Sequence, residues 1–395
     1  MWAYLIFPKI ICGANSGILL GELIILILFI KFCYKRKINW NVSFVMIILL
    51  LFSVYHYIFS NLINSINVSY GLFWFLYFVK FLLVFFIYIY VKNFNTLNSN
   101  EMLKKYIINP FIIITIVSVV IYLIYFFLNK PNAQDILWGY SLGFRLIPVF
   151  GVGIDLQKIL LKPIGGGSGN LLGTYSIIIL IIASNKIKSQ KKIIIIFTIL
   201  VALQFLSMSR GSLLTIAVYF FWFLLFKKKK YFTLIFISVA ILFFCFLYKD
   251  EIFFLRRIIN TVQNGELDRS SWGRIQNYID GYYEWSKNII TILFGIGNDS
   301  IILQEKIEWS LIESFILGTL YSDGIIGIGI YVTMFIQITI NRKKNMYSQI
   351  LFEYVFFCTL IQWSITGGDF WGPVNLYLLV IIECIIYQFQ KENLK

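Results

Sequence analysis

The chain has 395 residues, of which 59% are hydrophobic and only 13% are charged, and its formal net charge at pH 7 is +15. Soluble domains carry about 25% charged residues, so the composition excludes an ordinary soluble protein and predicts an integral membrane protein. The positive charge does not indicate nucleic-acid binding, because most lysines lie in short loops between apolar runs, as the positive-inside rule describes.

Apolar runs recur along the chain, and a run of about 20 residues can cross a bilayer as a helix. We therefore predict an all-α fold, a polytopic transmembrane helical bundle of about 11–12 spans, in which residues 1–395 form a single integral membrane domain. The predicted spans are residues 18–33, 41–60, 71–91, 107–128, 171–184, 193–209, 211–226, 231–248, 321–340, 348–365 and 374–389. The first segment, residues 1–17, is compatible with an interfacial helix or a twelfth span.

Lysine-rich loops predict the orientation of these spans. The basic segments are "KFCYKRK", Lys92 with Lys104 and Lys105, "NKIKSQKK", "KKKK", "NRKK" and the C-terminal tail. They fall on one side of the predicted bundle, which we assign to the cytoplasm. Two long loops, residues 129–170 and 249–310, then face outward, the second with short amphipathic helices. Long loops on one face of a bundle commonly carry function.

The segment "LSMSRGSLLT" places Arg210 inside a long apolar run, residues 193–226. As one helix this run would be about 51 Å long at roughly 1.5 Å per residue, against a hydrocarbon core of about 30 Å. Both flanks are strongly basic and belong on the same side. The run is therefore predicted to fold back as a hairpin, with Arg210 at its outer tip rather than at the bilayer centre, where a charge is costly.

Arginine is distributed differently from lysine. Of the eight arginines only Arg36 and Arg342 fall in cytoplasmic loops; the outward-facing ones are Arg145, Arg210, Arg256, Arg257, Arg269 and Arg274. A guanidinium group presents a rigid fork of donors that matches phosphate oxygens and stays charged beside lipid. The outer arginines are thus candidates to bind a lipid-linked pyrophosphate, although loop residues or anchors to anionic headgroups would show the same pattern.

Four sequence features follow one another along the predicted outer side of the protein. Arg145 precedes "GGGSGNLLGTYSIII", and Ser209-Arg210-Gly211 forms an "SRG" tip. Arg274 begins an amphipathic segment that ends in "LFGIG". Glu313 precedes a helix of the form "xxxLxxxGxxG" in "ESFILGTLYSDGIIG". In kind and in order, over about half of the chain, these features resemble the O-antigen polymerase and O-antigen ligase superfamily, membrane glycosyltransferases of the GT-C type.

The resemblance implies polymerisation of undecaprenyl-pyrophosphate-linked repeat units at the outer face of the bacterial cytoplasmic membrane, giving O-antigen, capsule or exopolysaccharide. Arg145, Arg210 and Arg274 would stabilise the departing pyrophosphate. Glu313 would act as base or orient the acceptor hydroxyl; a role at the helix start is the alternative. Ligases tend to carry a histidine at this position, and the only histidine here, His56, is predicted to be packed in the core.

Further candidates for substrate binding are the remaining outer polar and aromatic side chains, which are Arg256, Arg257, Arg269, Asp299, Trp272, Tyr278 and Tyr282. The aromatic residues could stack on sugars or form an interfacial belt. Asp323 and Asp369 are secondary carboxylates, expected in turns, caps or sugar contacts. No acidic cluster of the DxD kind stands out in the outer loops, so no metal or other cofactor is expected.

The expected partners are the lipid-linked glycans, membrane lipid, and a chain-length regulator and a flippase of the same pathway, with no nucleic acid. Two other functions stay open on the sequence. One is a ligase-type glycosyltransferase, and the other is a polysaccharide flippase or transporter. Transporters usually carry polar interruptions near the midplane of paired halves, whereas the charged residues here gather on one outer face.

Overall fold

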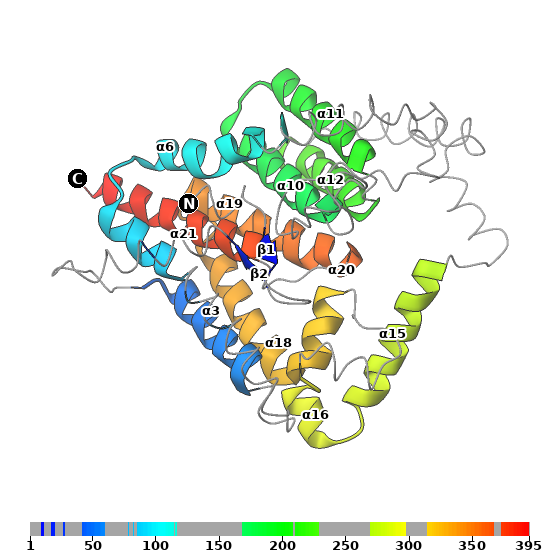
Figure 1. Cartoon of the computed structure of the whole chain (residues 1–395). Helices are drawn as coiled ribbons and strands as arrows, with labels where there is room; N and C mark the ends of the chain where they lie inside the picture. Colours follow the sequence, from blue (N-terminus) through cyan, green and yellow to red (C-terminus); the bar gives the residue numbers. More distant parts are fainter. Residues whose placement is uncertain are drawn as a thin grey trace, which may run out of the picture.

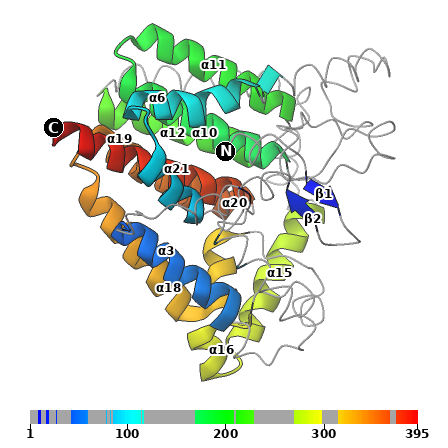
Figure 2. The same ribbon diagram turned by 60° about the vertical axis from the view of Figure 1, so that its left-hand side comes forward.

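The computed structural model describes residues 9–11, 17–19, 27, 42–59, 78, 82, 85–113, 115–116, 168–207, 210–228, 269–297, 314–366 and 373–394. Within these ranges the regular structure is helical apart from one pair of short strands (Figures 1 and 2). The longer helices are α3 (Phe44–Val54), α10 (Ser168–Lys186), α11 (Gln190–Ser207), α12 (Arg210–Trp222), α15 (Arg269–Trp285), α18 (Phe315–Asn341), α19 (Met346–Tyr354) and α21 (Pro373–Asn393).

Short elements complete the described chain. They are α6 (Ser99–Leu103), α16 (Ile289–Phe294), α20 (Trp363–Thr366) and the π-helical turns η1 (Tyr55–Phe59), η2 (Lys104–Ile108), η3 (Phe223–Lys227) and η4 (Val355–Gln362). Each of the predicted spans 41–60, 171–184, 193–209, 211–226, 321–340, 348–365 and 374–389 coincides with helix over most of its length. The all-α prediction is therefore confirmed for the described spans.

The N-terminal segment differs from the prediction. Strand β1 (Lys9–Ile11) pairs antiparallel with β2 (Gly17–Leu19), and Ile10 lies opposite Ile18. An interfacial helix or a twelfth span was expected over the first strand, and the second overlaps the start of the predicted span 18–33. β-branched isoleucines favour extended backbone, and the intervening sequence "CGANSG" is rich in turn-forming residues.

The predicted hairpin around Arg210 is confirmed. Helix α11 ends at Ser207, and α12 begins at Arg210. The rings of Phe197 and Phe220 stack with their centroids 4.0 Å apart, whereas the two residues would be about 35 Å apart in one continuous helix. The two helices therefore fold back on each other, and Arg210 is the first residue of α12.

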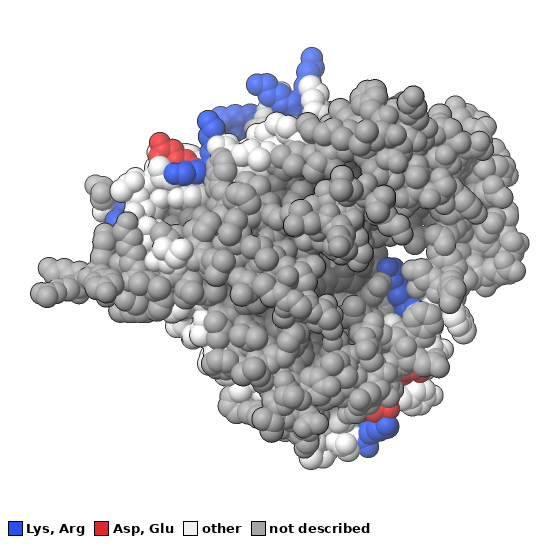
Figure 3. Space-filling view, in the orientation of Figure 1, with Lys and Arg blue, Asp and Glu red and all other residues white. Residues whose placement is uncertain are grey.

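The other ends of these helices meet at a basic end of the bundle, formed by residues 92–105, 185–192, 227–228, 341–347 and 391–394. Lys227 Nζ donates to Asn185 Oδ1 at 2.9 Å. The backbone N–H of Ser99 donates to Glu392 Oε1 at 2.8 Å, and the Lys186 ammonium donates to Asn100 Oδ1. Figure 3 shows the lysines and arginines of this end gathered near α6 and α11. The prediction that the lysine-rich segments share one side is thus confirmed for the described ones, whereas "KFCYKRK" and the end of "KKKK" lie outside the described residues.

The centre of the bundle is built from α10, α12, α19, η4 and α21, whose inward side chains are almost fully buried. Helix α18 packs against α3 and η1 along one side of this core, as both views show (Figures 1 and 2). Among the described residues, α18 is the one helix long and apolar enough to cross a membrane, with a mean hydropathy of 1.6 over its most apolar stretch. Shorter apolar helices run over Phe44–Val54 and Gly211–Lys227.

Candidate functional site at the kink of α18

Helix α18 is broken at Gly324, the residue that follows Asp323. Gly324 has φ +67° and ψ −168°, a conformation open to glycine but strained for other residues. A Cβ atom at this position would lie 2.3 Å from the carbonyl oxygen of Leu293. The kink therefore depends both on the backbone freedom of glycine and on the absence of a side chain.

The chain that follows α16 docks into this kink through its glycine pair. The backbone N–H of Ile296 donates to the carbonyl of Tyr321 at 2.7 Å, and that of Gly297 donates to the carbonyl of Ser322 at 3.1 Å. Gly295 has φ +82°, and a Cβ there would lie 2.1 Å from the Ser322 carbonyl oxygen. The segments "LFGIG" and "YSDGIIG", which carry two of the four features of the resemblance, are therefore in direct backbone contact.

A buried polar cluster holds the other side of the kink. His56 Nδ1 lies 2.9 Å from Asp323 Oδ1 and 2.8 Å from Oδ2. The hydroxyl of Tyr55 donates to the carbonyl of Asp323 at 2.7 Å and also approaches the carbonyl of Phe294 at 3.3 Å. Helical hydrogen bonding is commonly disturbed at a kink, and here the Tyr55 hydroxyl donates to the carbonyl beside it. The cluster joins η1, α16 and α18.

Helix α15 packs against the same part of α18 and carries Arg274. The hydroxyl of Tyr321 donates to the carbonyl of Tyr278 at 3.2 Å, and the rings of Trp285 and Tyr321 lie 6.1 Å apart. Helical geometry places Arg274, which is partly buried, on the face opposite the exposed stripe described next. The arginine is thus on the side of α15 that faces the protein rather than its surroundings.

The exposed stripe of α15 is apolar and aromatic. Its members are Trp272, Ile275, Ile279, Tyr282 and Tyr283, with exposed fractions from 37% to 64%. They recur at the spacing of one helical face, and a helix that exposes such a face while carrying polar residues elsewhere suits a membrane interface. Of the sugar-stacking candidates, Trp272 and Tyr282 lie on this stripe, whereas Tyr278 is half-buried beside α18. The exposure of Trp272 and Tyr282 is compatible with both roles, the interfacial belt and sugar stacking.

Arg210 occupies the first position of α12, at the end of the bundle away from the basic loops. Two residues later, Ser212 is fully buried, and its hydroxyl accepts from Gln362 Nε2 at 3.1 Å. A Cβ at Gly173 would lie 1.9 Å from Ser212 Oγ, so α10 and α12 approach closely here. This packing fixes the start of α12, and the N-terminus of a helix favours anions.

The remaining candidates can be placed only in part. Arg269 is the first residue of α15. Arg145, Arg256, Arg257, Asp299 and Glu313, together with the secondary candidate Asp369, lie outside the described residues. Glu313 immediately precedes Ser314, which is buried at the start of α18. Convergence of Arg145, Arg210 and Arg274 stays a prediction.

The prediction that His56 is packed in the core is confirmed, because its exposed fraction is 4%. Its pairing with Asp323 was not predicted, and Asp323 is a fully buried partner rather than a sugar-contacting residue. The sequence did indicate that such a pair could form, because ionisable residues within membrane spans usually pair with one another. No group of three His, Cys, Asp or Glu among the described residues is arranged to hold a metal ion.

Comparison with protein-family models gives no match for this chain, and comparison with curated proteins gives no match either.

Proposed function

We propose that the protein is a multi-pass membrane glycosyltransferase that polymerises undecaprenyl-pyrophosphate-linked repeat units at the outer face of the bacterial cytoplasmic membrane. The contact between the "LFGIG" segment and the kink of α18 is the observation that carries the proposal. This contact joins two segments that are separate features of the resemblance. Helix α15, which carries Arg274, packs against the same part of α18.

Exposure of large apolar side chains supports the membrane part of the proposal. Only 33% of the most apolar stretch of α18 is buried inside the protein, unlike the core helix of a soluble protein. Ile336 and Ile340 on α18, and Ile195 and Ile199 on α11, are each at least half exposed. Soluble monomers rarely expose extended apolar surfaces, so lipid is the environment that these helices suit.

The position of α15 supports an active site at the outer surface. One face of the helix presents an apolar stripe that suits the membrane interface. Arg274 lies on the other face, toward the bundle. A pyrophosphate whose lipid tail stays in the bilayer would reach the protein at this depth. Arg274 would act there together with Arg145 and Arg210, at the end of the bundle opposite the basic loops.

The proposed reaction is a glycosyl transfer. The bond between the anomeric carbon of the growing glycan and its pyrophosphate oxygen breaks, and a bond from that carbon to a hydroxyl of a second lipid-linked repeat unit forms. The acceptor proton passes to a base, for which Glu313 is the candidate. The arginines stabilise the charge that develops on the departing pyrophosphate, without a metal ion. The product is an O-antigen, capsular or exopolysaccharide chain, and a flippase and a chain-length regulator would act with the enzyme.

The test uses the purified full-length chain in proteoliposomes with synthetic, labelled undecaprenyl-pyrophosphate repeat units. Formation of labelled oligomers on the lipid carrier is the expected result. Transfer of the label across the bilayer without oligomers would instead identify a transporter, and transfer of glycan only to a different acceptor would identify a ligase-type enzyme. Either result would overturn the proposal.

A further inference from the structure

A pocket opens at the basic end of the bundle, far from the kink of α18. It lies between the start of α3, the C-terminal part of α18, helix α21 and the helical residues 85–94, and its volume is about 270 Å³. Ligand sites commonly enclose about 300–1,000 Å³, so the pocket suits a small headgroup rather than a complete lipid-linked glycan. It does not belong to the site proposed for glycosyl transfer.

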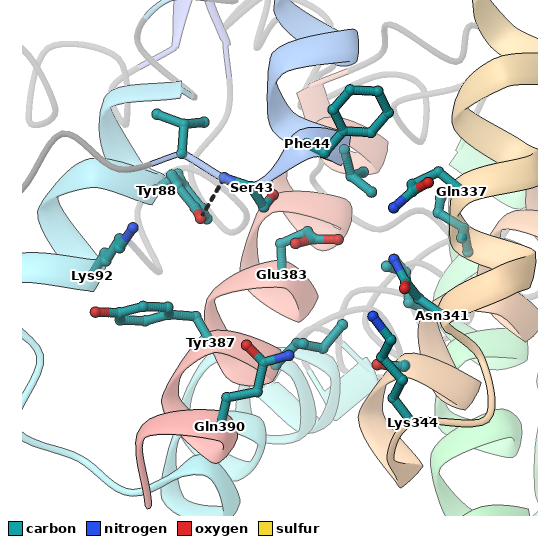
Figure 4. Close-up of a pocket in the computed structure, with 16 residues that line it drawn as sticks. Ser43, Phe44, Tyr88, Lys92, Gln337, Asn341, Lys344, Glu383, Tyr387 and Gln390 are labelled. Carbon is teal, nitrogen blue, oxygen red and sulfur yellow. Dashed lines mark hydrogen bonds between the residues drawn. The ribbon is translucent and has the colours of Figure 1, made fainter. Parts of the chain in front are cut away.

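The charged side chains of the pocket are Lys92, Lys344 and Glu383. Figure 4 shows the two lysines on opposite sides of the pocket, with Glu383 between them on α21. Partial burial lowers the pKa of Lys92, whose ammonium group lies 4.5 Å from the centre of the Tyr387 ring, and a nearby anion would favour its charged form. The two ammonium groups outnumber the one carboxyl group, so the pocket carries a positive charge that favours an anion such as a phosphodiester.

The pocket also offers one acceptor that lacks a donor. The side-chain oxygen of Asn341 is buried and has no hydrogen-bond partner among the described residues, and an unsatisfied buried acceptor is costly. Asn341 and Glu383 both line the pocket. A ligand that suits these walls must therefore combine an anionic group for the lysines with hydroxyl or ammonium donors for the oxygens.

The surroundings of the pocket favour a lipid as the source of such a ligand. Ile336 and Ile340 are 52% and 65% exposed, and each directly precedes a residue that lines the pocket, Gln337 and Asn341. An apolar ridge thus runs along α18 next to the polar pocket. A headgroup bound in the pocket would leave its acyl chains beside this ridge.

We propose that this pocket binds the headgroup of an anionic phosphoglycerol lipid on the basic side of the protein. Lys92 and Lys344 hold the phosphodiester, and the headgroup hydroxyls donate to Glu383 and to the side-chain oxygen of Asn341. A phosphoethanolamine lipid fits less well, because its zero net charge does not match the positive excess of the pocket. The proposal is independent of glycosyl transfer.

The experiment measures which lipid stays bound to the purified full-length protein. The protein is reconstituted in vesicles of phosphatidylethanolamine and phosphatidylglycerol, re-extracted in mild detergent and analysed by native mass spectrometry. We expect retention of phosphatidylglycerol over phosphatidylethanolamine, and a loss of about tenfold in that retention for Lys344→Gln, since a charge-assisted hydrogen bond is removed. Lys343→Gln is the matched control, because Lys343 and Lys344 are both exposed and only Lys344 lines the pocket.

A second variant, Asn341→Leu, tests the acceptor without altering charge, and the melting temperature of each variant shows whether it is folded. Equal retention by wild type and both pocket variants would overturn the proposal, and so would a preference for phosphatidylethanolamine. Displacement of the lipid by millimolar glycerol phosphate would show that the pocket binds a free phosphate ester, which would overturn the lipid assignment. Retention that resists glycerol phosphate supports the proposal.

Discussion

His56 and Asp323 are 267 residues apart in the sequence, and they pair inside the bundle with His56 Nδ1 at 2.8 Å from Asp323 Oδ2. The pair connects η1 to the kink of α18. The side chain of Asp323 also accepts from the hydroxyl of Ser322 at 3.1 Å. The carboxylate is therefore held by two neighbours at the place where the backbone of α18 turns, and it secures the kink that receives the "LFGIG" segment.

Removal of this carboxylate is expected to destabilise the protein. Asp323→Ala removes the buried hydrogen bonds that this carboxylate makes with His56 and Ser322, and the loss of a buried hydrogen-bond partner costs about 1–3 kcal/mol. The measurement is the melting temperature of the detergent-solubilised protein, which should fall clearly. Glu284→Gln is the control, because the Glu284–Lys287 pair is on the surface of the protein, with the Lys287 side chain 60% exposed, and such pairs contribute about 0–1 kcal/mol. Equal melting temperatures for wild type and Asp323→Ala would contradict the assigned role.

Substitution of the kink glycine should be more disruptive than substitution of another glycine in the same helix. Gly324→Ala combines a strained φ with a Cβ 2.3 Å from a backbone oxygen. Gly329→Ala meets nothing within 4 Å and should be tolerated, or stabilise by up to about 1 kcal/mol because alanine is the better helix former. Size-exclusion profiles and melting temperatures of the two variants test the difference. Equal melting temperatures and elution profiles for Gly324→Ala and Gly329→Ala would show that the kink does not require glycine at position 324.

An ion pair at the basic end joins the partly buried Lys227 to the buried Glu353. Lys227 Nζ lies 2.6 Å from Glu353 Oε1, and Glu353 is fully buried and also accepts from the Tyr219 hydroxyl at 2.8 Å. Lys227→Met should destabilise the protein by about 3–5 kcal/mol, since the carboxylate of Glu353 loses its cation. The neighbouring Lys228→Met should stay within about 0.5 kcal/mol of wild type. Thermal unfolding of both variants provides the comparison, and a neutral Lys227→Met would show that the pair is dispensable.

The two ends of the bundle should be accessible from opposite sides of the membrane. We expect a cysteine at Lys287, between α15 and α16, to react with a membrane-impermeant maleimide in intact spheroplasts. A cysteine at Lys343, at the basic end, should react only after permeabilisation. Both substitutions are made in a background in which the five native cysteines are replaced. Labelling of both positions from the same side would contradict the proposed topology.

Hydrophobic patterning and basic loops were sufficient to predict most of the longer described helices and the shared side of the described basic segments, whereas α6 lies in a predicted loop. The length of the run around Arg210 also predicted its hairpin, because no single helix of that length fits a bilayer. These features depend on local composition and on membrane thickness. They can therefore be derived without knowledge of which helices are neighbours.

The contacts of the candidate site could not be derived in the same way. Asp323 and His56 lie in different apolar segments, and sequence alone does not show that these two segments are adjacent. The kink at Gly324 depends on a close approach by the chain near Gly295, again a tertiary property. The strand Lys9–Ile11 was missed because a short apolar run gives too little periodicity to distinguish strand from helix.

Arg274 provides the sharpest test of the catalytic proposal. Arg274→Lys keeps the positive charge but loses the planar fork that binds two phosphate oxygens at once. We expect polymer formation from labelled lipid-linked repeat units to fall by about a hundredfold or more, as for the loss of one donor that stabilises developing charge. The melting temperature should stay close to that of wild type. Lys287→Met, just beyond the C-terminal end of α15, should retain full activity. Wild-type activity in Arg274→Lys would exclude Arg274 from the site, because a phosphate-binding role depends on guanidinium geometry, whereas a general surface charge does not.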